Sequence, residues 1–515
     1  MLEGFLIRFG QTIIEASITL SIGFLVAAVC RRALGAEGVR QLFGGGQWSS
    51  LLRAWLIGTL LPVCSLGLIP VIRELRRCGV PQRTLLAFVL ATPQLNPLSL
   101  LYGLTLAEPS VLGAFIICNL SFAVLGGWLW ARFYDRPEDL QVPEPEPLPE
   151  PGERRLAAIV LASCRAAVSP ALGYVLLGVL NTACVAMLLP FGSLSWTMRH
   201  DQWWAPELML AVGTLVYSGV LPGMMRITSM FDHGNSVGAA FLLFQVGIGW
   251  NVGLAAWLIR EFGPRRMGLW MATLFALMLV LAHAMEFTLY FAHTEADHTH
   301  AFDDWTRPQG ASLWPEWSVV QRAWLDRVGV LEPVGIVSLG LLLVGGVIVR
   351  VINPNQSWDE ALCTWRRPPG SQQSLWHRPL PGWVTGSVAL VILIALSIMG
   401  LYLYYPDSQQ GFREIARIRA DAYSAIHTGN VAEAIRQLEF YDLWLRKTQI
   451  GILLRSWQWN HELAQATQDL RQHIERLRDL LLAGEMDQAK AYVATVEKVH
   501  RRCREAYRQV ETAGQ

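Results

Sequence analysis

Long apolar stretches recur along the chain, and they constrain its fold more than any other feature. A helix needs about 20 mostly apolar residues to cross a hydrocarbon core about 30 Å thick, and it satisfies its own backbone hydrogen bonds. Such stretches lie near residues 11–30, 84–106, 111–131, 166–190, 237–259, 268–291, 334–352 and 384–404. With 52% hydrophobic and 16% charged residues, the chain has more apolar surface than a soluble fold can bury. The pattern predicts an all-α integral membrane protein.

Two further apolar stretches are interrupted near their middle. Stretch 52–72 contains Pro62, Cys64, Ser65, Gly67 and Pro70, and stretch 206–225 contains Ser218, Gly219, Pro222 and Gly223. Proline leaves a backbone carbonyl unpaired, which is tolerated at membrane depth only where protein or water takes it up. We expect both stretches to be transmembrane helices that break at depth, which makes about ten spans in all.

Composition divides the chain into six regions. We expect a first membrane repeat at 1–134, a Pro/Glu-rich linker at 135–155, a second membrane repeat at 156–292, a polar loop carrying His, Asp and Trp at 293–333, two additional transmembrane helices at 334–405 and a soluble helical domain at 406–515. The linker composition is typical of an extended chain without a core. Beyond Pro406 the pattern becomes amphipathic and charged at helical spacing, with Gly429 and Gly484 between segments, which predicts a small bundle of helical hairpins.

An internal duplication links the two membrane repeats. Gly58-Thr59-Leu60 recurs as Gly213-Thr214-Leu215, Gly79 matches Gly234, and Asn96 matches Asn251. All three matches have the same offset, since 213 − 58, 234 − 79 and 251 − 96 each equal 155. Repeats that each contain a broken helix favour a transport site at their interface near the bilayer midplane. The sequence thus predicts two related four-helix halves with such a site between them.

The run from Gly58 to Leu101 also resembles a known family. It contains Pro62, Cys64, Ser65, Gly67 and Pro70, then Gly79 and Pro81, then Ala91, Thr92, Pro93, Asn96 and Pro97. In order and spacing it is similar to the signature of the predicted permeases that include the organoarsenical efflux permeases. The firm motif covers about forty residues, and the architecture extends over residues 10–290. The resemblance implies a permease fold and efflux of a small solute or a metal or metalloid species.

The sequence departs from this signature at its thiols. Where the family has Cys-Ser-Cys, this chain has Cys64-Ser65-Leu66, and the second repeat has Tyr217-Ser218-Gly219 without a cysteine. A pair of soft thiolates suits trivalent arsenic, and one thiol suits it much less. The second-repeat stretch 247–252 keeps Asn251 and loses both prolines. These departures reduce the support for an arsenical substrate more than the support for the permease fold.

The candidate translocation residues are those at the breaks, and each has a structural alternative. They are Cys64, Ser65, Pro70, Pro93, Asn96, Pro97, Ser218 and Asn251. A buried cysteine is often an inert small hydrophobe, and a buried asparagine often bonds across helices. Their placement at matching breaks of two repeats favours a site lining.

Two weaker candidates involve ionisable groups. His283 and Glu286 lie three residues apart on one helical face, so they form either a polar contact or a proton path. His293, Asp297, His298 and His300, in the polar loop, supply ligand types that suit zinc, nickel or copper, although solvated polar loops are commoner. Glu15 lies early in the first span and is expected near the interface.

Composition and motifs argue against other function classes. A formal net charge of +1 provides no basic face for nucleic acid, and eight scattered cysteines form no disulfide or zinc pattern. The chain has no nucleophile with a partnered base, phosphate-binding glycine loop or HExxH helix. We therefore expect neither an enzyme nor a bound cofactor.

Two functions from different classes remain. The first is a permease in the cell membrane that exports a small solute or a metal or metalloid species. The second is a transport-inactive scaffold whose C-terminal domain binds a protein partner. The arginines flanking 52–72 give opposing signals for the N-terminus, whereas Arg366, Arg367 and Arg378 favour a cytoplasmic loop and thus an extracytoplasmic C-terminal domain.

Overall fold

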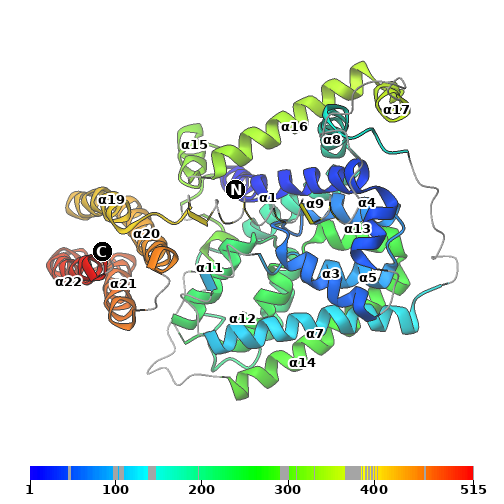
Figure 1. The fold of residues 1–515 in the computed structure, drawn as a ribbon. Helices are drawn as coiled ribbons and strands as arrows, with labels where there is room; N and C mark the ends of the chain where they lie inside the picture. Colours follow the sequence, from blue (N-terminus) through cyan, green and yellow to red (C-terminus); the bar gives the residue numbers. More distant parts are fainter. Residues whose placement is uncertain are drawn as a thin grey trace. The chain divides into compact units, whose positions relative to one another are not determined.

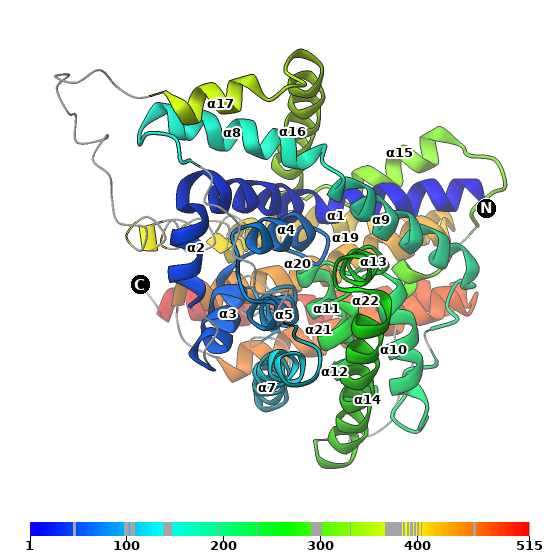
Figure 2. The same ribbon diagram turned by 90° about the vertical axis from the view of Figure 1, so that its right-hand side faces the viewer.

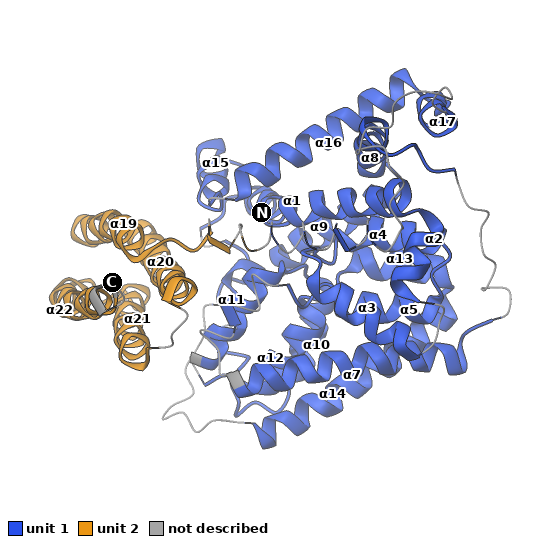
Figure 3. Ribbon diagram, in the orientation of Figure 1, with its two compact units in different colours: residues 1–397 blue, residues 398–515 orange. Residues whose placement is uncertain are grey.

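A computed structural model describes the chain except for a set of short segments. These are residues 45–47, 97–101, 104–108, 137–146, 195, 233, 290–300, 309, 330, 366–383, 385–386, 389–390, 392–394, 396–397, 399–400, 403, 457–459 and 514–515. All the regular elements of the described residues are helices. Contacts divide the chain into two compact units, residues 1–397 and residues 398–515 (Figure 3). Each unit is described by itself below.

Among its described residues, the first unit contains five unbroken helices that are long and apolar enough to cross a membrane. They are residues 2–43, made of α1 (Leu2–Val29), a π-helical turn (Cys30–Leu34) and α2 (Gly35–Phe43), then α7 (Pro109–Phe133), α9 (Ala171–Leu188), α14 (Pro264–Thr288) and α16 (Glu332–Ile352). The all-α membrane fold that the apolar stretches predict is confirmed for the described residues. The predicted spans at 84–106 and 384–404 lie partly outside the described residues.

The interrupted stretch 52–72 breaks as predicted, but it does not cross the unit. It forms α3 (Trp48–Leu60), a break at 61–67 and α4 (Leu68–Arg77), which together we call hairpin 1. The two ends of hairpin 1 lie near each other, because Ser50 bonds to Thr84 at 2.9 Å and Thr84 follows α4 by seven residues, in the first turn of α5 (Gln82–Ala91). Helices of 13 and 10 residues reach only about 20 and 15 Å at 1.5 Å per residue, about halfway through a bilayer core. The expectation of a transmembrane helix here is therefore wrong.

The second interrupted stretch has the same form. Hairpin 2 consists of α10 (Ala205–Leu215), a break at 216–219 and α11 (Val220–Asp232). Its two ends are joined by the Ser236 N–H, which donates to the Met198 carbonyl at 2.9 Å. Hairpin 2 is thus also re-entrant, and its prediction as a crossing helix is likewise corrected.

The two hairpins open on opposite sides of the first unit. The beginning of α14 lies beside the open end of hairpin 1, because Arg266 donates to the Tyr134 carbonyl and α7 reaches Gln82 through Trp130 at 2.9 Å. The end of α14 lies beside the open end of hairpin 2, where Glu286 bonds to Ser236 at 2.7 Å. Figure 1 shows α14 alongside α7 in this direction, Figure 2 shows α7 end-on, and the two helices contact each other. We call the side where hairpin 1 opens the arginine face and the opposite side the N-terminal face.

One bent helix pair connects the two faces. α12 (Val237–Leu242) begins at the N-terminal face and continues into a π-helical turn (Leu243–Gly247), and α13 (Val252–Phe262) follows at an angle of 57°. α13 ends at the arginine face, where Glu261 pairs with Arg76 at 2.9 Å. This pair therefore crosses the unit with a break near its middle.

The remaining helices of the first unit lie around α1. They are α8 (Glu153–Ala167), α15 (Trp317–Leu325) and α17 (Ser357–Thr364), with a 3-10 turn at Asp303–Trp305. The buried Asp359 of α17 pairs with Arg32 at 3.3 Å and with Arg165 at 2.8 Å. This triad holds α17 and α8 against the end of α1 on the arginine face.

The second unit is a set of helical hairpins. Its long helices are α19 (Ser408–Thr428), α20 (Val431–Ser456), α21 (His461–Leu482) and α22 (Met486–Ala513). Gly429 is the C-cap of α19 and has a φ of 76°, and the turn before α22 contains Gly484 with a φ of 78°, conformations that glycine adopts without strain. A core of aliphatic and aromatic side chains from all four helices joins the two hairpins.

Candidate functional site

The tips of the two hairpins meet beside the middle of α1. The N–H of Gly219, at the tip of hairpin 2, donates to the Glu15 carboxylate at 2.5 Å. About two turns further along α1, Gly23 packs on Gly67 of the other tip, so closely that a Cβ at Gly23 would lie 2.4 Å from the Gly67 oxygen. Residues 15 and 23 belong to the central part of a helix that begins at Leu2 and continues past Val29. Both breaks are therefore at mid-depth, in the interior of the unit.

Polar side chains and local turns satisfy the backbone of the broken segments. In hairpin 1, Leu68 donates to the Cys64 carbonyl at 2.9 Å, and Gly67 donates to the Cys64 sulfur at 3.4 Å. In hairpin 2, Tyr217 N–H donates to the Thr182 hydroxyl at 2.8 Å, and Asn181 donates to the Leu215 carbonyl at 2.7 Å. Non-helical backbone at this depth needs such partners because it is shielded from bulk water.

Two of the predicted residues bond directly. The Asn251 amide donates to the Ser65 hydroxyl at 3.0 Å, and its oxygen accepts from the Leu254 N–H at 2.9 Å, which caps α13. Both side chains are fully buried. Asn251 thus joins the tip of hairpin 1 to the break before α13, and it has a structural role whether or not it binds a solute.

Cys64 and Ser218 lie on opposite tips. The Tyr217 hydroxyl is near the Cys64 thiol and Thr19, but no described neighbour meets it with hydrogen-bond geometry. Ser218 accepts from Arg226 of α11 at 2.7 Å. Cys64, Tyr217 and Ser218 are all buried, so the two tips form one packed polar region.

A second polar cluster joins the remaining breaks. Gln94, in the turn after α5, donates to the Gln245 carbonyl at 3.0 Å, and its own side-chain oxygen is buried without a partner among the described residues. Asn119 of α7 donates to the Leu90 carbonyl at 3.0 Å and accepts from Trp55 at 2.9 Å. The segments 92–96 and 243–251 therefore lie together, as the two hairpin tips do.

The other predicted positions that the structure describes lie in or beside the broken segments. Asn96 and Pro93 are buried in the turn after α5, and Pro70 is buried in the first turn of α4, where a missing N–H costs no helical hydrogen bond. Pro97 lies outside the described residues. The structure thus joins Ser65 to Asn251 and places Cys64 and Ser218 on neighbouring tips.

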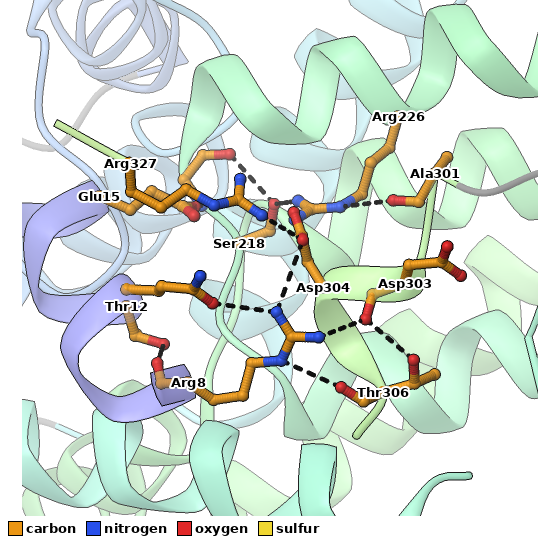
Figure 4. A network of polar contacts seen from close by, with 12 residues as sticks. Arg8, Thr12, Glu15, Ser218, Arg226, Ala301, Asp303, Asp304, Thr306 and Arg327 are labelled. Atoms are coloured by element: carbon orange, nitrogen blue, oxygen red, sulfur yellow. Dashed lines mark hydrogen bonds and ion pairs between the residues drawn. The ribbon is translucent and has the colours of Figure 1, made fainter. Parts of the chain in front are cut away.

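An ionic network connects the tip of hairpin 2 to the N-terminal face. Asp304 pairs with Arg226 at 3.5 Å, with Arg8 at 3.7 Å and with Arg327 (Figure 4). Arg8 also donates to the carbonyls of Thr306 at 3.0 Å and Asp303 at 2.7 Å. The network therefore joins α1, α11 and the segment 301–308.

Asp304 is the centre of this network and is one-third exposed. Burial alone would raise the pKa of its carboxyl, but the guanidinium groups of Arg327, Arg8 and Arg226 outweigh burial and hold that pKa well below its usual value. Asp304 is therefore a carboxylate at neutral pH. It offsets part of the positive charge that Arg226 places behind the tip of hairpin 2.

His283 and Glu286 have separate partners near the open end of hairpin 2. His283 bonds to Glu207 at 2.8 Å. Glu286 accepts from Ser236 and from the Gly238 N–H, both at 2.7 Å, and so holds the start of α12. Both residues make local contacts away from the tips, and a proton path through them stays a prediction.

The predicted metal ligands of the polar loop cannot be placed. His293, Asp297, His298 and His300 lie outside the described residues, within which no group of His, Cys, Asp and Glu could hold a metal ion. The segment 301–308, which follows them in the chain, contributes Asp304 and several backbone carbonyls to the ionic network.

The residues that the sequence did not indicate are mainly those that support the tips. Arg226 is 5% exposed, and its position inside an apolar stretch is the sequence signal that could indicate it, because a charge at membrane depth is costly and usually functional. Glu15 was expected near the interface and lies at a tip. Gln94, Asn119 and Gln245 carry no such signal, because single amides are common in membrane helices.

Two comparisons with known proteins give matches for this chain. The sequence model of the family described as "Predicted permease" matches residues 1–287. The chain is also similar to the UPF0718 protein YcgR of Bacillus subtilis (strain 168), with 30% identity over 92 residues. That match covers 18% of this chain and 31% of the relative, so the chain spans about a third of the relative's length. No solved structure matches.

Proposed function

The chain belongs to the predicted permease family, and we propose that it moves a small solute, or a metal or metalloid species, through the interface of the two hairpin tips. The observation that carries this proposal is that two hairpins entering from opposite faces end against each other beside the centre of α1. In this proposal hairpin 1 separates the tips from the arginine face, and hairpin 2 separates them from the N-terminal face. Displacing one hairpin would open the tips to one face while the other hairpin keeps them closed, as alternating access requires.

The solute would be held by Cys64, Ser65, Ser218 and Asn251. Two polar atoms beside them, the Tyr217 hydroxyl and the Gln94 side-chain oxygen, are buried without partners among the described residues. Such an atom costs about 1–3 kcal/mol. A solute that bonds to them would recover this cost, which supports a ligand site here. Asn96, Pro93 and Pro97 would shape the break beside it, and Pro70 would do so in hairpin 1.

The chemistry of the tips favours an oxygen-bearing solute. The two breaks contain one thiol, Cys64, whereas Ser65, Ser218, Asn251 and Arg226 offer hydroxyl, amide and guanidinium groups. These groups bind hydroxyl or oxyanion oxygens, and one thiolate is a weak site for a soft ion. A metalloid substrate would therefore carry oxygen atoms and form at most one sulfur bond. Export is the direction that the family resemblance implies.

We also propose that the two halves arose by duplication with inverted orientation. α7 and α14 have 25 residues each and begin at Pro109 and Pro264, 155 residues apart (264 − 109). Gly58 packs on Thr92, and Gly213 packs on Gly247, at the same offset (213 − 58 and 247 − 92). Opposite openings of the hairpins fit the inverted repeats of many transporters.

Flux into proteoliposomes tests the proposal. Purified protein should move at least one member of a panel of oxyanions, metal salts and metalloid species, and expression should change growth on the same compound. Cys64 should react with a membrane-impermeant thiol reagent from one side, and the transported compound should slow this reaction. Absence of flux across the panel, with Cys64 protected from both sides, would favour the alternative of a transport-inactive scaffold.

A further inference from the structure

A second site lies on the arginine face, away from the hairpin tips. A cavity of about 430 Å³ opens there between hairpin 1 and the helices α9 and α13. Its volume lies within the range of about 300–1,000 Å³ that is usual for small-molecule sites. We call it the arginine pocket, and the residues that line it include Arg73, Arg76, Arg77, Tyr174, Trp257 and Arg260.

The charges of this pocket are not balanced. Arg76 pairs with Glu261 at 2.9 Å, and Arg77 pairs with Glu74 at 3.1 Å. Arg260 donates to the hydroxyl of Tyr174 at 2.8 Å. Within the described part of the chain, Arg73 makes no hydrogen bond or ion pair. Among the described residues, the guanidinium groups of Arg73 and Arg260 form no ion pair, although the carboxylate of Glu261 is close enough to interact electrostatically with both. Four guanidinium groups thus face two carboxylates, each of which already has an ion-pair partner.

The surroundings of the pocket favour an anion at a membrane surface. α9 begins in the pocket at Ala171, and the positive end of its dipole adds to the arginine charges. Trp257 is buried in the wall, and Trp and Tyr are the aromatic side chains that collect at headgroup level. Arginine binds phosphate oxygens through two parallel N–H bonds, and basic pockets between membrane helices hold phosphorylated headgroups.

We propose that the arginine pocket binds a phosphate group, with Arg73 and Arg260 as its main donors. The phosphate belongs either to an anionic lipid headgroup or to a free anion, since both present the same oxygens. Because the pocket joins α4 to α9 and α13, its occupation holds hairpin 1 against the rest of the unit. The site is independent of the solute that passes the tips.

Thermal unfolding of the full chain in nanodiscs tests this site. Inorganic phosphate is titrated into discs of zwitterionic lipid against chloride at equal ionic strength, and separate discs contain a rising fraction of phosphatidylglycerol. The melting temperature should rise with one of the two probes, and this probe identifies the source of the phosphate. No rise with either probe overturns the proposal.

Paired variants separate the pocket from general surface charge. For the double variant Arg73→Gln and Arg260→Gln, the concentration of phosphate or phosphatidylglycerol that gives half of the maximal rise in melting temperature should be at least tenfold higher than for the wild type. The control Arg53→Gln and Arg265→Gln removes the same charge from exposed positions on the same face and should change it less than twofold. An equal change in both variants overturns the proposal. If the glutamine double variant does not fold, the double variant Arg73→Lys and Arg260→Lys is used instead. It keeps the positive charges but cannot donate two parallel N–H bonds to one phosphate. Wild-type behaviour of this lysine variant also overturns the proposal.

Discussion

At the scale of single residues, the unpartnered hydroxyl of Tyr217 distinguishes a ligand site from packing. Tyr217→Phe removes a buried polar atom that has no partner within the described residues, so the folded protein should be as stable as the wild type or more stable by about 1 kcal/mol. If the hydroxyl binds the solute, the same change should lower the flux at least tenfold. Melting temperature and proteoliposome flux are measured together. A stabilised variant with unchanged flux would assign Tyr217 to packing alone.

Asp304 is predicted to matter for stability because it serves three arginines. Asp304→Asn removes the charge that faces Arg8, Arg226 and Arg327, and it should destabilise the protein by about 1–3 kcal/mol, less than a fully buried pair because Asp304 is one-third exposed. Asp201→Asn is the matched control, since Asp201 pairs with Arg199 in an exposed contact worth little. Thermal unfolding in one detergent compares the two. If both variants lose the same small amount of stability, the ion pairs of Asp304 contribute no more than a solvent-exposed surface pair.

At the scale of elements, the contact between α1 and hairpin 1 depends on two glycines. Gly23→Ala would place a methyl group 2.4 Å from the Gly67 carbonyl oxygen and force the tip away from α1. Overpacking of this kind costs about 1–3 kcal/mol. Gly113→Ala in α7 meets no atom within 4 Å and should be neutral or slightly stabilising, because alanine favours a helix. We expect Gly23→Ala to lower both melting temperature and flux, and similar behaviour of the two variants would contradict the tight contact.

At the scale of the whole molecule, the fold resolves the conflicting arginine signals. Arg31 interacts electrostatically with Arg73, so the arginines on both sides of hairpin 1 belong to one face. Because hairpin 1 returns to its starting side, the positive-inside rule predicts that the arginine face is cytoplasmic. α16 begins near the opposite face and ends at this one, where Arg350 donates to the Val168 carbonyl. We predict a cytoplasmic linker at 135–155 and an external loop at 293–333.

Single cysteines in a cysteine-free background check this orientation. Glu144→Cys in the linker should react with an impermeant reagent only after the membrane is opened, and Asp297→Cys should react in intact cells. Labelling of both from the same side would contradict a path in which α14 crosses the membrane. The predicted span at 384–404 lies partly outside the described residues, and the extracytoplasmic location of the C-terminal domain stays a prediction of the sequence.

The C-terminal unit should lose stability in mild acid. Burial, with the nearby charges of Arg419, Arg504 and Arg501, lowers the pKa of His500 to about 3, from an ordinary value of about 6.5. The unfolded histidine binds a proton as the pH falls below about 6.5 while the folded one stays neutral and bonded to Tyr441 at 2.6 Å, so stability is lost in this window. The loss should reach about 2 kcal/mol at pH 5.

Denaturation of a fragment starting at the helix cap Asp407 measures this effect. His500→Gln should remove most of the fall in the free energy of unfolding between about pH 7 and about pH 5. His427→Gln, at an exposed position, should leave this fall unchanged. A random-coil spectrum of the fragment at neutral pH would refute the independent bundle itself.

The sequence alone determined the membrane class and two of the places where the chain breaks, within 52–72 and 206–225. It did not indicate the break inside the predicted span 237–259, where α13 follows the π-helical turn at an angle of 57°. Apolar length, prolines such as Pro62 and the repeated Asn96 and Asn251 are local signals, and local signals report helix formation and interruption directly. The sequence could not show that hairpins 1 and 2 turn back, because apolar content is the same for a crossing and a returning segment. Only the contacts of Ser50 with Thr84 and of Ser236 with Met198 decide that path. Likewise, the pairing of Ser65 with Asn251, and of Asp304 with three arginines, joins residues far apart in the chain. Partner choice at such separations depends on how whole helices pack, which no short stretch of sequence records.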